Sequence, residues 1–241
     1  MTERIDPGLV RVVTFDGDGT LWDVRAAARL ALEGVVRKLR TEIPQARSVI
    51  VTDLERAREA VAAERPGRSM EEIRQASFAQ VLAGCGADVD DDYIADLTTW
   101  FLEQRRERTK PYTDVRSALE ALNAGGYRLA LLTDGNTTPD VPGLADLLSG
   151  YVHVSALAGR WKPDPEIWRS AAVFFGVEPA RVLHVGDDPD LDYRAALAAG
   201  CQALLLCRSR SCPGHQERCV SSLSEVFNLL AVNRSSTADA E

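Results

Sequence analysis

Short apolar runs alternate with longer segments of helical periodicity along most of the chain. Residues 10–15 form a β-branched and aromatic run that is too short for an independent helix, which predicts a buried strand of a parallel sheet. Later strand-like runs cover residues 128–133, 151–155, 181–186 and 202–207. Helical segments separate them at 113–126, 140–149, 165–175, 191–199 and 223–231. This alternation is typical of an α/β fold, a doubly wound parallel sheet with helices on both faces.

The segment that follows the first strand shows helical periodicity without a strand. Helices are predicted at 24–43, 52–65, 69–83 and 91–107. Thr52-x-x-Glu55 and Ser69-x-x-Glu72 have the spacing of capping boxes and predict two of the helix starts. We therefore expect an all-helical domain at 24–110, inserted into an α/β core made of 1–23 and 111–232, and a flexible tail at 233–241.

Composition and charge narrow the classes of function. The 241 residues are 45% hydrophobic and 27% charged, as in ordinary globular proteins. The net charge is −8 and there is no basic run, so neither nucleic acid nor an anionic membrane is an expected partner. No apolar run is long enough to span a bilayer, and residues 1–8 lack the apolar part of a signal peptide, which predicts a cytoplasmic protein. The odd number of cysteines, five, argues against structural disulfides.

Two carboxylates leave the first predicted strand in the turn Asp16-Gly17-Asp18-Gly19. Asp16 lies at the carboxyl end of the strand, where ligands bind in open α/β sheets. Gly17 and Gly19 relieve steric limits on the backbone, so Asp18 can turn back towards Asp16 and main-chain N–H groups can approach an anion. The alternative is an ordinary Asp/Gly turn after a strand. Three further stretches downstream argue against it.

Two of these stretches offer groups for an anionic substrate. Thr133 ends the strand at 128–133 and can donate its hydroxyl to a phosphoryl oxygen, although a threonine at such a position is commonly only a helix cap. Lys162, in Lys162-Pro163-Asp164-Pro165, carries an ammonium group that lowers the repulsion between carboxylates and a phosphoryl dianion. The alternative for Lys162 is a solvent-facing side chain before a helix.

The last stretch, residues 182–192, places several carboxylates in a turn after a strand. Asp187 follows the strand directly and Asp192 begins the next helix. Oxygen ligands with room for water are the ligands that Mg²⁺ prefers. Acidic turns are often only helix N-caps, and this alternative weighs most for Asp190. His184 lies in the apolar strand, where we expect a core histidine with hydrogen-bond partners rather than a catalyst.

The four stretches, in this order, resemble the motifs of the haloacid dehalogenase-like (HAD) hydrolases. Asp16-x-Asp18-Gly-Thr-Leu-x-Asp23 looks like the first motif, and the resemblance covers nearly the whole chain. It implies a Rossmann-like core with a helical cap inserted after the first motif, which closes over the site and selects the leaving group. It also implies Asp16 as a nucleophile that forms an aspartyl-phosphate and Asp18 as general acid and base.

The same resemblance assigns the remaining site residues. It implies that the substrate is bound by Gly17, Thr133, Asp134 and Lys162, although the family commonly has Asn where this chain has Asp134. It implies that Mg²⁺ is held by Asp16, the backbone carbonyl of Asp18 and Asp187, and by Asp192 through water or hydrogen bonds. Asp188 stands where many relatives carry Ser. It is expected either to contact the metal or to support the metal ligands.

The expected function is a Mg²⁺-dependent phosphatase that acts on a small phosphorylated metabolite, as a monomer or homodimer. A phosphomutase would share all four motifs. A 2-haloacid dehalogenase of the same fold uses the first Asp on carbon, but such relatives lack the second, so Asp18 argues against it. A phosphonate-cleaving enzyme would want a lysine in the cap, where residues 24–109 carry only Lys38. A non-catalytic binding module is expected to have lost one of the key residues.

Two further groups of residues lie outside the four stretches. Cys207, Cys212, His215 and Cys219 could bind zinc, but their spacing matches no close metal signature and lacks a Cys-x-x-Cys half. The aromatic residues of the helical segment have the spacing of helix-core positions and are expected to pack its interior; they are Phe78, Tyr93, Trp100 and Phe101.

Overall fold

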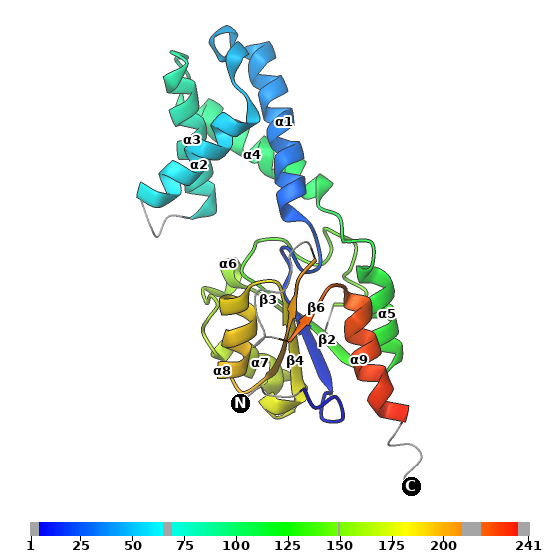
Figure 1. Ribbon diagram of the computed structural model, residues 1–241. Coiled ribbons are helices and arrows are strands. Elements are labelled where there is room, and N and C mark those ends of the chain that lie inside the picture. Colours follow the sequence, from blue (N-terminus) through cyan, green and yellow to red (C-terminus); the bar gives the residue numbers. More distant parts are fainter. Residues whose placement is uncertain (1–4, 65–68, 149, 209–217, 236–241) are drawn as a thin grey trace. The chain divides into compact units, whose positions relative to one another are not determined.

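The computed structural model describes residues 5–64, 69–148, 150–208 and 218–235, and these residues form two compact units. The first unit consists of residues 1–23 and 110–241, and the second of residues 24–109. Figure 1 shows the sheet of the first unit and the helices of the second. Each unit has its own buried apolar side chains, so each is described by itself.

The first unit is built on a parallel sheet. Its strands among the described residues are β1 (Val12–Phe15), β2 (Arg128–Thr133), β3 (Tyr151–Val154), β4 (Val182–Gly186), β5 (Gln202–Leu206) and β6 (Cys219–Val220). Their order is β3-β2-β1-β4-β5-β6, and every neighbouring pair is parallel. The central strand β1 is buried throughout, because helices cover both faces. The predicted α/β fold with a doubly wound parallel sheet is confirmed.

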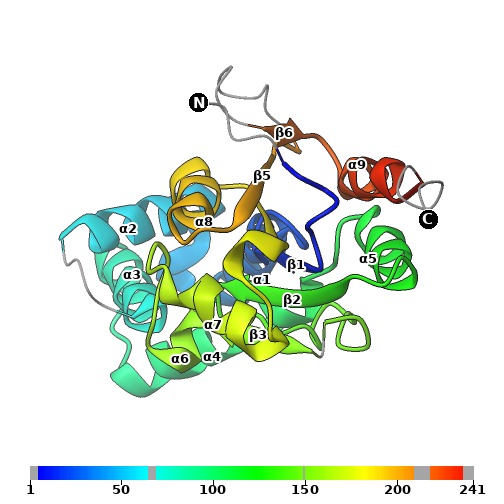
Figure 2. The ribbon, with the colours of Figure 1, turned by 90° about the horizontal axis from the view of Figure 1, so that it is seen from below.

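Helices lie on both faces of this sheet, as Figures 1 and 2 show. On one face α5 (Val115–Ala124) and α9 (Leu223–Ser235) pack against each other. On the other lie α7 (Glu166–Phe175) and the short α8 (Ala195–Ala198). Shorter elements are α6 (Ser155–Ala158), a 3₁₀ turn at Pro179–Arg181 and a π turn at Pro189–Arg194. The layers bury the strands and leave their ends accessible to loops.

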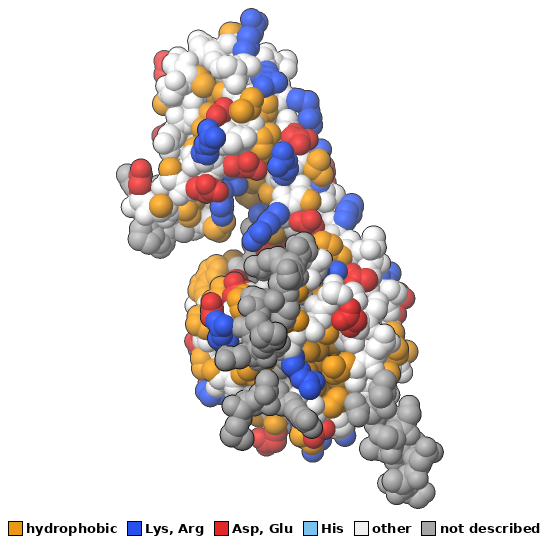
Figure 3. Space-filling model, in the orientation of Figure 1, with side chains coloured by type: hydrophobic (Ala, Val, Ile, Leu, Met, Phe, Trp, Pro, Cys, Tyr) orange, Lys and Arg blue, Asp and Glu red, His pale blue; other side chains and the backbone are white. Residues whose placement is uncertain are grey.

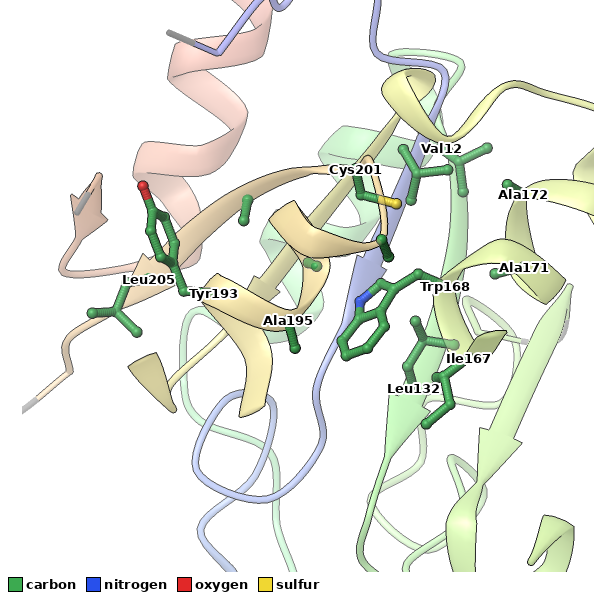
Figure 4. Close-up of a cluster of buried hydrophobic side chains, with 14 residues drawn as sticks. Val12, Leu132, Ile167, Trp168, Ala171, Ala172, Tyr193, Ala195, Cys201 and Leu205 are labelled. Carbon is green, nitrogen blue, oxygen red and sulfur yellow. The ribbon is translucent and has the colours of Figure 1, made fainter. Parts of the chain in front are cut away.

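A cluster of apolar side chains joins the sheet to α7 and α8. Trp168 lies at its centre and is fully buried, with Leu132, Ile167 and Ala195 around its ring (Figure 4). Aromatic rings of this size bury a large apolar area and dominate the energetics of a core. The cluster therefore fixes α7 against the strands that carry the catalytic candidates.

The second unit is all helical. Its elements are α1 (Val24–Glu42), a 3₁₀ turn at Pro44–Ser48, α2 (Val51–Glu64), α3 (Met70–Gly84) and α4 (Asp91–Arg108). The capping box predicted at the start of α3 is present: Glu72 N donates to Ser69 Oγ at 3.2 Å and Ser69 N donates to Glu72 Oε2 at 2.8 Å. Phe78 and Phe101 meet edge to face at 5.9 Å, as expected for aromatic residues of this helical core.

Two predicted caps are wrong for a physical reason that the sequence did not reveal. Helix α2 already begins at Val51, and Ile50 N donates to Asp53 Oδ2 at 3.0 Å, so the Thr52 capping box does not form. The helix predicted from residue 113, with Thr113 as its cap, begins at Val115 with Asp114 as the residue before it. The Asp114 carboxylate instead accepts from Arg208 and from Leu223 N, at 2.9 and 2.8 Å.

The structure differs from the predicted elements at three other places. Residues 140–148 form turns in place of the predicted helix, since Pro142 and Gly143 interrupt the run. Helix α9 continues to Ser235, so the start of the predicted tail is helical, and the rest of that tail lies outside the described residues. The two-residue strand β6 was not predicted, because so short a segment carries no periodicity of its own.

Two features concern membranes: the length and hydropathy of the helices, and the charges on the surface. No helix among the described residues is both long enough and apolar enough to cross a bilayer. In Figure 3, Lys and Arg side chains are interspersed with Asp and Glu side chains over the visible face of the helical unit. A mixed surface of this kind is typical of the solvent-exposed faces of helices.

Candidate active site

Three neighbouring strands deliver polar residues to one edge of the sheet. In the register of the sheet, Phe15 of β1 is level with Leu131 of β2 and Val185 of β4. Residues that follow these positions therefore leave the three strands side by side, because the strands are parallel. The carboxyl ends of parallel strands are where open α/β sheets bind their ligands.

Lys162 joins two of the predicted carboxylates. Its Nζ donates to Asp16 Oδ1 at 2.7 Å and to Asp192 Oδ1 at 2.6 Å, and all three side chains are buried. Charge-assisted hydrogen bonds of this length are among the strong ones in proteins. Lys162 is thus no solvent-facing residue before a helix, which was the alternative interpretation.

Asp187 completes a cluster of three carboxylates. One oxygen each from Asp16, Asp187 and Asp192 lies within 4.8 Å of the others. Gly19 makes this approach possible, since it has φ +92° and a Cβ there would lie 2.7 Å from Asp187 Oδ2. Only glycine adopts this conformation without strain and leaves that room. The turn after β1 and the turn after β4 are therefore in direct contact.

The charges of the cluster do not balance. Burial raises the pKa of Asp16 well above its usual value, and Lys162 only partly opposes this. Burial also opposes ionisation of Asp192, but the nearby Lys162 and His184 outweigh it and hold the pKa of that carboxyl below its usual value. With one ammonium group among three carboxylates, the donor set fits a hard divalent cation.

Asp18 is held in place beside this cluster. Its Oδ1 accepts from Trp22 Nε1 at 2.6 Å, and Trp22 is fully buried in the same turn. The other oxygen, Oδ2, lies against Gly135, where a Cβ would collide with it. A carboxylate with one oxygen engaged and the other directed at the end of β2 is oriented rather than free to rotate.

Thr133 and Asp134 follow β2, and the structure gives them different surroundings. Thr133 is buried, and its Oγ1 accepts from Gly135 N at 3.1 Å. Asp134 Oδ1 accepts from Ser155 Oγ at 2.6 Å and from Lys162 N at 3.1 Å. The Asp134 carboxylate therefore braces the backbone of the segment that carries Lys162, a function that the sequence did not suggest.

His184 belongs to the same hydrogen-bond network. Its Nε2 lies 3.2 Å from Asp192 Oδ1 and its Nδ1 lies 2.9 Å from Thr14 Oγ1, and the ring packs edge-on against Trp168 at 5.3 Å. Because an ionised carboxylate only accepts, Nε2 carries the proton and Nδ1 accepts from the Thr14 hydroxyl. Burial lowers the pKa of His184, which favours this neutral form. His184 is a core histidine with partners, as expected, but one of its partners is a site carboxylate.

The remaining acidic residues of the last stretch act as local supports. Asp192 Oδ2 accepts from Asp188 N at 3.1 Å, so both oxygens of Asp192 are engaged by the protein. Asp188 Oδ1 accepts from the backbone of Asp190 and Leu191, each at 2.8 Å, which is an N-cap. Asp190 is exposed and pairs with Arg194. The cap interpretation that was expected for Asp190 therefore applies to Asp188, and Asp190 lies within the turn as a surface residue.

His153 is linked to Asp134 through the hydroxyl of Ser155. Its Nε2 is 2.9 Å from the carbonyl oxygen of Arg160 and 3.3 Å from Ser155 Oγ. Ser155 in turn donates to Asp134. The sequence offered no signal for these hydrogen bonds, because the residues that make them are brought together only by the turn between β3 and α7.

The cysteines correct one expectation. Cys219 is disulfide-bonded, whereas Cys85, Cys201 and Cys207 are thiols. An odd number of cysteines does not prevent two of them from pairing, so the expectation of no disulfide was wrong. A sulfur in a disulfide is not a zinc ligand. Cys212 and His215, which belong to the same group of four residues that could bind zinc, lie outside the described residues.

Comparison with known proteins identifies the class. The family model of the haloacid dehalogenase-like hydrolases matches residues 10–200. The match covers strands β1 to β4 and the four stretches that build the cluster of carboxylates. The chain belongs to the haloacid dehalogenase-like hydrolase family, and the resemblance of the motifs is confirmed.

Individual relatives carry more than one activity in their names. A phosphoserine phosphatase of Thermus thermophilus is 34% identical over 138 residues, which is 55% of this chain and 53% of the relative. The 5-amino-6-(5-phospho-D-ribitylamino)uracil phosphatase YigB of Escherichia coli is 28% identical over 81% of this chain and 83% of its own length. A solved 2-haloacid dehalogenase from Pseudomonas syringae has a TM-score of 0.71 and 28% identity, over 92% of this chain and 98% of that one.

Proposed function

We propose that this protein is a Mg²⁺-dependent phosphatase that hydrolyses a small organic phosphate monoester through an aspartyl-phosphate. The observation that carries the proposal is the pair Asp16 and Asp18 at the end of β1. Asp16 is held by Lys162, and Asp18 is oriented independently by Trp22. Two carboxylates with different partners can take different roles in one reaction.

In the proposed reaction Asp16 is the nucleophile. One of its carboxylate oxygens forms a bond to phosphorus while the bond between phosphorus and the ester oxygen breaks, and Asp18 gives its proton to the leaving alkoxide. Water then attacks the aspartyl-phosphate, and Asp18 takes a proton from that water. Inorganic phosphate leaves, and Asp16 and Asp18 return to their starting states.

Other residues offset the charge that builds up on the transferred group. Lys162 keeps its proton, because the carboxylates of Asp16 and Asp192 raise its pKa against the effect of burial. Its ammonium, the Thr133 hydroxyl and the turn amides after Asp16 are proposed to stabilise the phosphoryl oxygens. His184 contacts Asp192, which binds the Lys162 ammonium, and Asp134 binds the backbone N–H of Lys162, so we assign both residues positioning roles.

The donor set supports Mg²⁺ as the cofactor. Asp16, Asp187 and the backbone carbonyl of Asp18 are proposed to hold it, with Asp192 at the next distance because its oxygens already accept from protein donors. A divalent cation supplies positive charge that lowers the repulsion between the carboxylates and the phosphate. The oxygen-only donor set favours it over zinc or copper.

The relatives support a phosphate ester as substrate. Both curated relatives described above are named as phosphatases of small phosphorylated molecules. One of the similar solved structures is a 2-haloacid dehalogenase, so this activity is the second candidate function. We favour the phosphatase, because a displacement at carbon needs neither the second carboxylate, Asp18, nor a divalent cation. We further propose that the helical unit, residues 24–109, sets the choice of substrate.

Two assays on the purified protein test the proposal. Hydrolysis of p-nitrophenyl phosphate is measured with Mg²⁺ and again after exhaustive chelation, and halide release from 2-chloropropionate is measured without metal. We expect phosphatase activity that is lost on chelation and restored by Mg²⁺. Metal-independent halide release without phosphatase activity would establish the dehalogenase instead.

A further inference from the structure

Arg74 is a buried cation without a hydrogen-bonded anion in the helical unit. It lies on α3, which packs against both α2 and α4, and only 8% of the residue is exposed. Its Nη1 is fully enclosed and has no hydrogen-bond partner. Its guanidinium lies instead over the rings of Phe101 and Phe78, at 4.5 and 5.6 Å from their centroids. Buried charges in proteins are normally paired, so this group is an exception that calls for an explanation.

The charged neighbours of Arg74 make the exception larger. Arg58 of α2 and Arg105 of α4 add to the effect of burial, and together they lower the pKa of Arg74 to about 10, with Glu55 opposing them. Three helices thus each direct an arginine to one region, which we call the arginine cluster: Arg58, Arg74 and Arg105. Within residues 24–109 the four residues that the structure does not describe, 65–68, contain no carboxylate.

The chemistry of the cluster is that of an anion site. A guanidinium presents its donors as a planar fork that matches the oxygens of a carboxylate or a phosphate. The Phe78 and Phe101 rings hold the Arg74 guanidinium by cation–π contacts, and Nη1 is a buried donor whose hydrogen-bonding capacity is not used by the described residues. A fixed donor also loses little freedom when a ligand binds.

We propose that the arginine cluster of the helical unit binds a compact oxyanion, a carboxylate or a phosphate group, with Arg74 as its central donor. The anion is a free one, such as inorganic phosphate or sulfate. The site consists of residues outside the catalytic cluster, so its existence does not depend on the proposed function.

The first experiment measures thermal unfolding of the wild type, Arg74→Met and Arg56→Met. Arg56 is an exposed arginine of the same unit, on α2, and serves as the matched control. Sodium sulfate or sodium phosphate is added at constant ionic strength in Mg²⁺-free buffer, where the carboxylates of Asp16, Asp187 and Asp192 repel anions from the catalytic cluster. Arg74→Met keeps most of the side-chain volume and removes the charge.

Without added anion we expect Arg74→Met to be at least as stable as the wild type, because a buried charge without a hydrogen-bonded anion is removed. With saturating sulfate or phosphate we expect the Tm of the wild type and of Arg56→Met to rise by about 3 °C or more, and that of Arg74→Met to stay unchanged. Equal rises in all three proteins, or no rise in any of them, would overturn the proposal.

A second variant covers the case in which Arg74→Met does not fold. Arg58 is only half-buried, so Arg58→Met tests the same cluster at a more tolerant position. We expect it to fold and to lose part of the anion-dependent rise in Tm. A full rise in Arg58→Met, together with an Arg74→Met protein that does not fold, would show that Arg74 is a structural residue held by its aromatic neighbours.

Kinetics with two esters of similar size, ethyl phosphate and carboxymethyl phosphate, test whether the anion site is separate from catalysis. Because a free anion binds at a site apart from the catalytic cluster, we expect Arg74→Met to leave the ratio of the two kcat/KM values within twofold of the wild-type ratio, while the difference in Tm persists. A change of tenfold or more in that ratio would overturn the proposal of a separate site. If neither ester is hydrolysed by any protein, the phosphatase proposal fails, and the anion site is still judged by its Tm difference.

Discussion

Lys162 and Asp16 are 146 positions apart in the chain, yet Lys162 Nζ donates to Asp16 Oδ1 at 2.7 Å in the interior of the sheet unit. The contact joins the end of the central strand to the loop before α7. A buried ion pair contributes little to stability by itself, because both charges lose their hydration. Its value here is chemical, since the ammonium keeps its position beside the group that we propose as nucleophile.

The first prediction concerns that ammonium. We expect Lys162→Met to lower kcat/KM for an aryl phosphate by about two orders of magnitude or more, roughly 2.7 kcal/mol, as for other preorganised charged groups. Steady-state kinetics checks this, with Lys110→Met as an exposed control. Unfolding in denaturant must be measured as well, because Asp16 and Asp192 are left without their cation. A variant that turns over like the wild type would remove Lys162 from the mechanism.

The second prediction concerns the proposed metal ligand Asp187. Asp187→Asn removes a negative charge from the cluster of three carboxylates, so the Mg²⁺ concentration for half-maximal activity should rise at least tenfold. Asp190→Asn is the matched control from the same turn, since Asp190 is exposed and pairs with Arg194. A titration with Mg²⁺ distinguishes them. Equal shifts in both variants would mean that Asp187 is not a ligand.

Much of the sheet unit could be predicted from sequence because its elements have strong local patterns. The strand β2 was predicted at its observed bounds, and β1 and β4 within two residues, since each is a β-branched or aliphatic run between turn residues. The helix predicted at 140–149 failed, because a few apolar residues in a run broken by Pro142 and Gly143 do not outweigh the turn preference.

The candidate site was predictable in part. The carboxylates, Thr133 and Lys162 stand in fixed runs at strand ends, where the sequence alone indicates chemistry. Asp134 was assigned by the family resemblance and His184 by its apolar strand, and both have partners in other segments: Ser155 and Lys162 for Asp134, and Thr14 for His184. No pattern within a single segment encodes such pairings. They exist only when the strands are assembled in register.

The third prediction tests the bracing role of Asp134. Asp134→Asn keeps Oδ1 as an acceptor for Ser155 Oγ and Lys162 N, whereas Asp134→Ala removes both hydrogen bonds. We expect the Asn variant to retain most of the activity, and the Ala variant to lose about tenfold in kcat and about 1–3 kcal/mol of stability. Kinetics and denaturant unfolding give both numbers. If Asn were as damaging as Ala, the charge of Asp134 would be needed, as in a direct substrate contact.

The fourth prediction concerns His184 as a positioning residue. His184→Leu takes one hydrogen-bond partner from Asp192 and one from Thr14, so we expect the apparent Mg²⁺ affinity to fall by about 10–100-fold, as for other outer supports of metal sites. Trp168→Phe is the control, because it disturbs the same core without touching the carboxylates. Both variants are expected to be less stable, but only His184→Leu should change the Mg²⁺ titration. A matching change in Trp168→Phe would reduce His184 to a packing residue.

The central claim is that Asp16 becomes phosphorylated and that Asp18 acts as the general acid and base. Asp18→Asn tests it best, because Asn can still accept the hydrogen bond from Trp22 Nε1, so the turn is expected to stay folded. An acyl phosphate has a leaving group that needs little protonation, so the variant should still transfer the phosphoryl group to Asp16 and then stall for want of a base.

The decisive measurement is mass spectrometry of Asp18→Asn after incubation with Mg²⁺ and acetyl phosphate. Our account predicts one added phosphoryl group on the peptide that contains Asp16, and no such addition in the double variant that also carries Asp16→Asn. An unmodified Asp16 in a folded Asp18→Asn protein that still hydrolyses alkyl phosphates at the wild-type rate would contradict it.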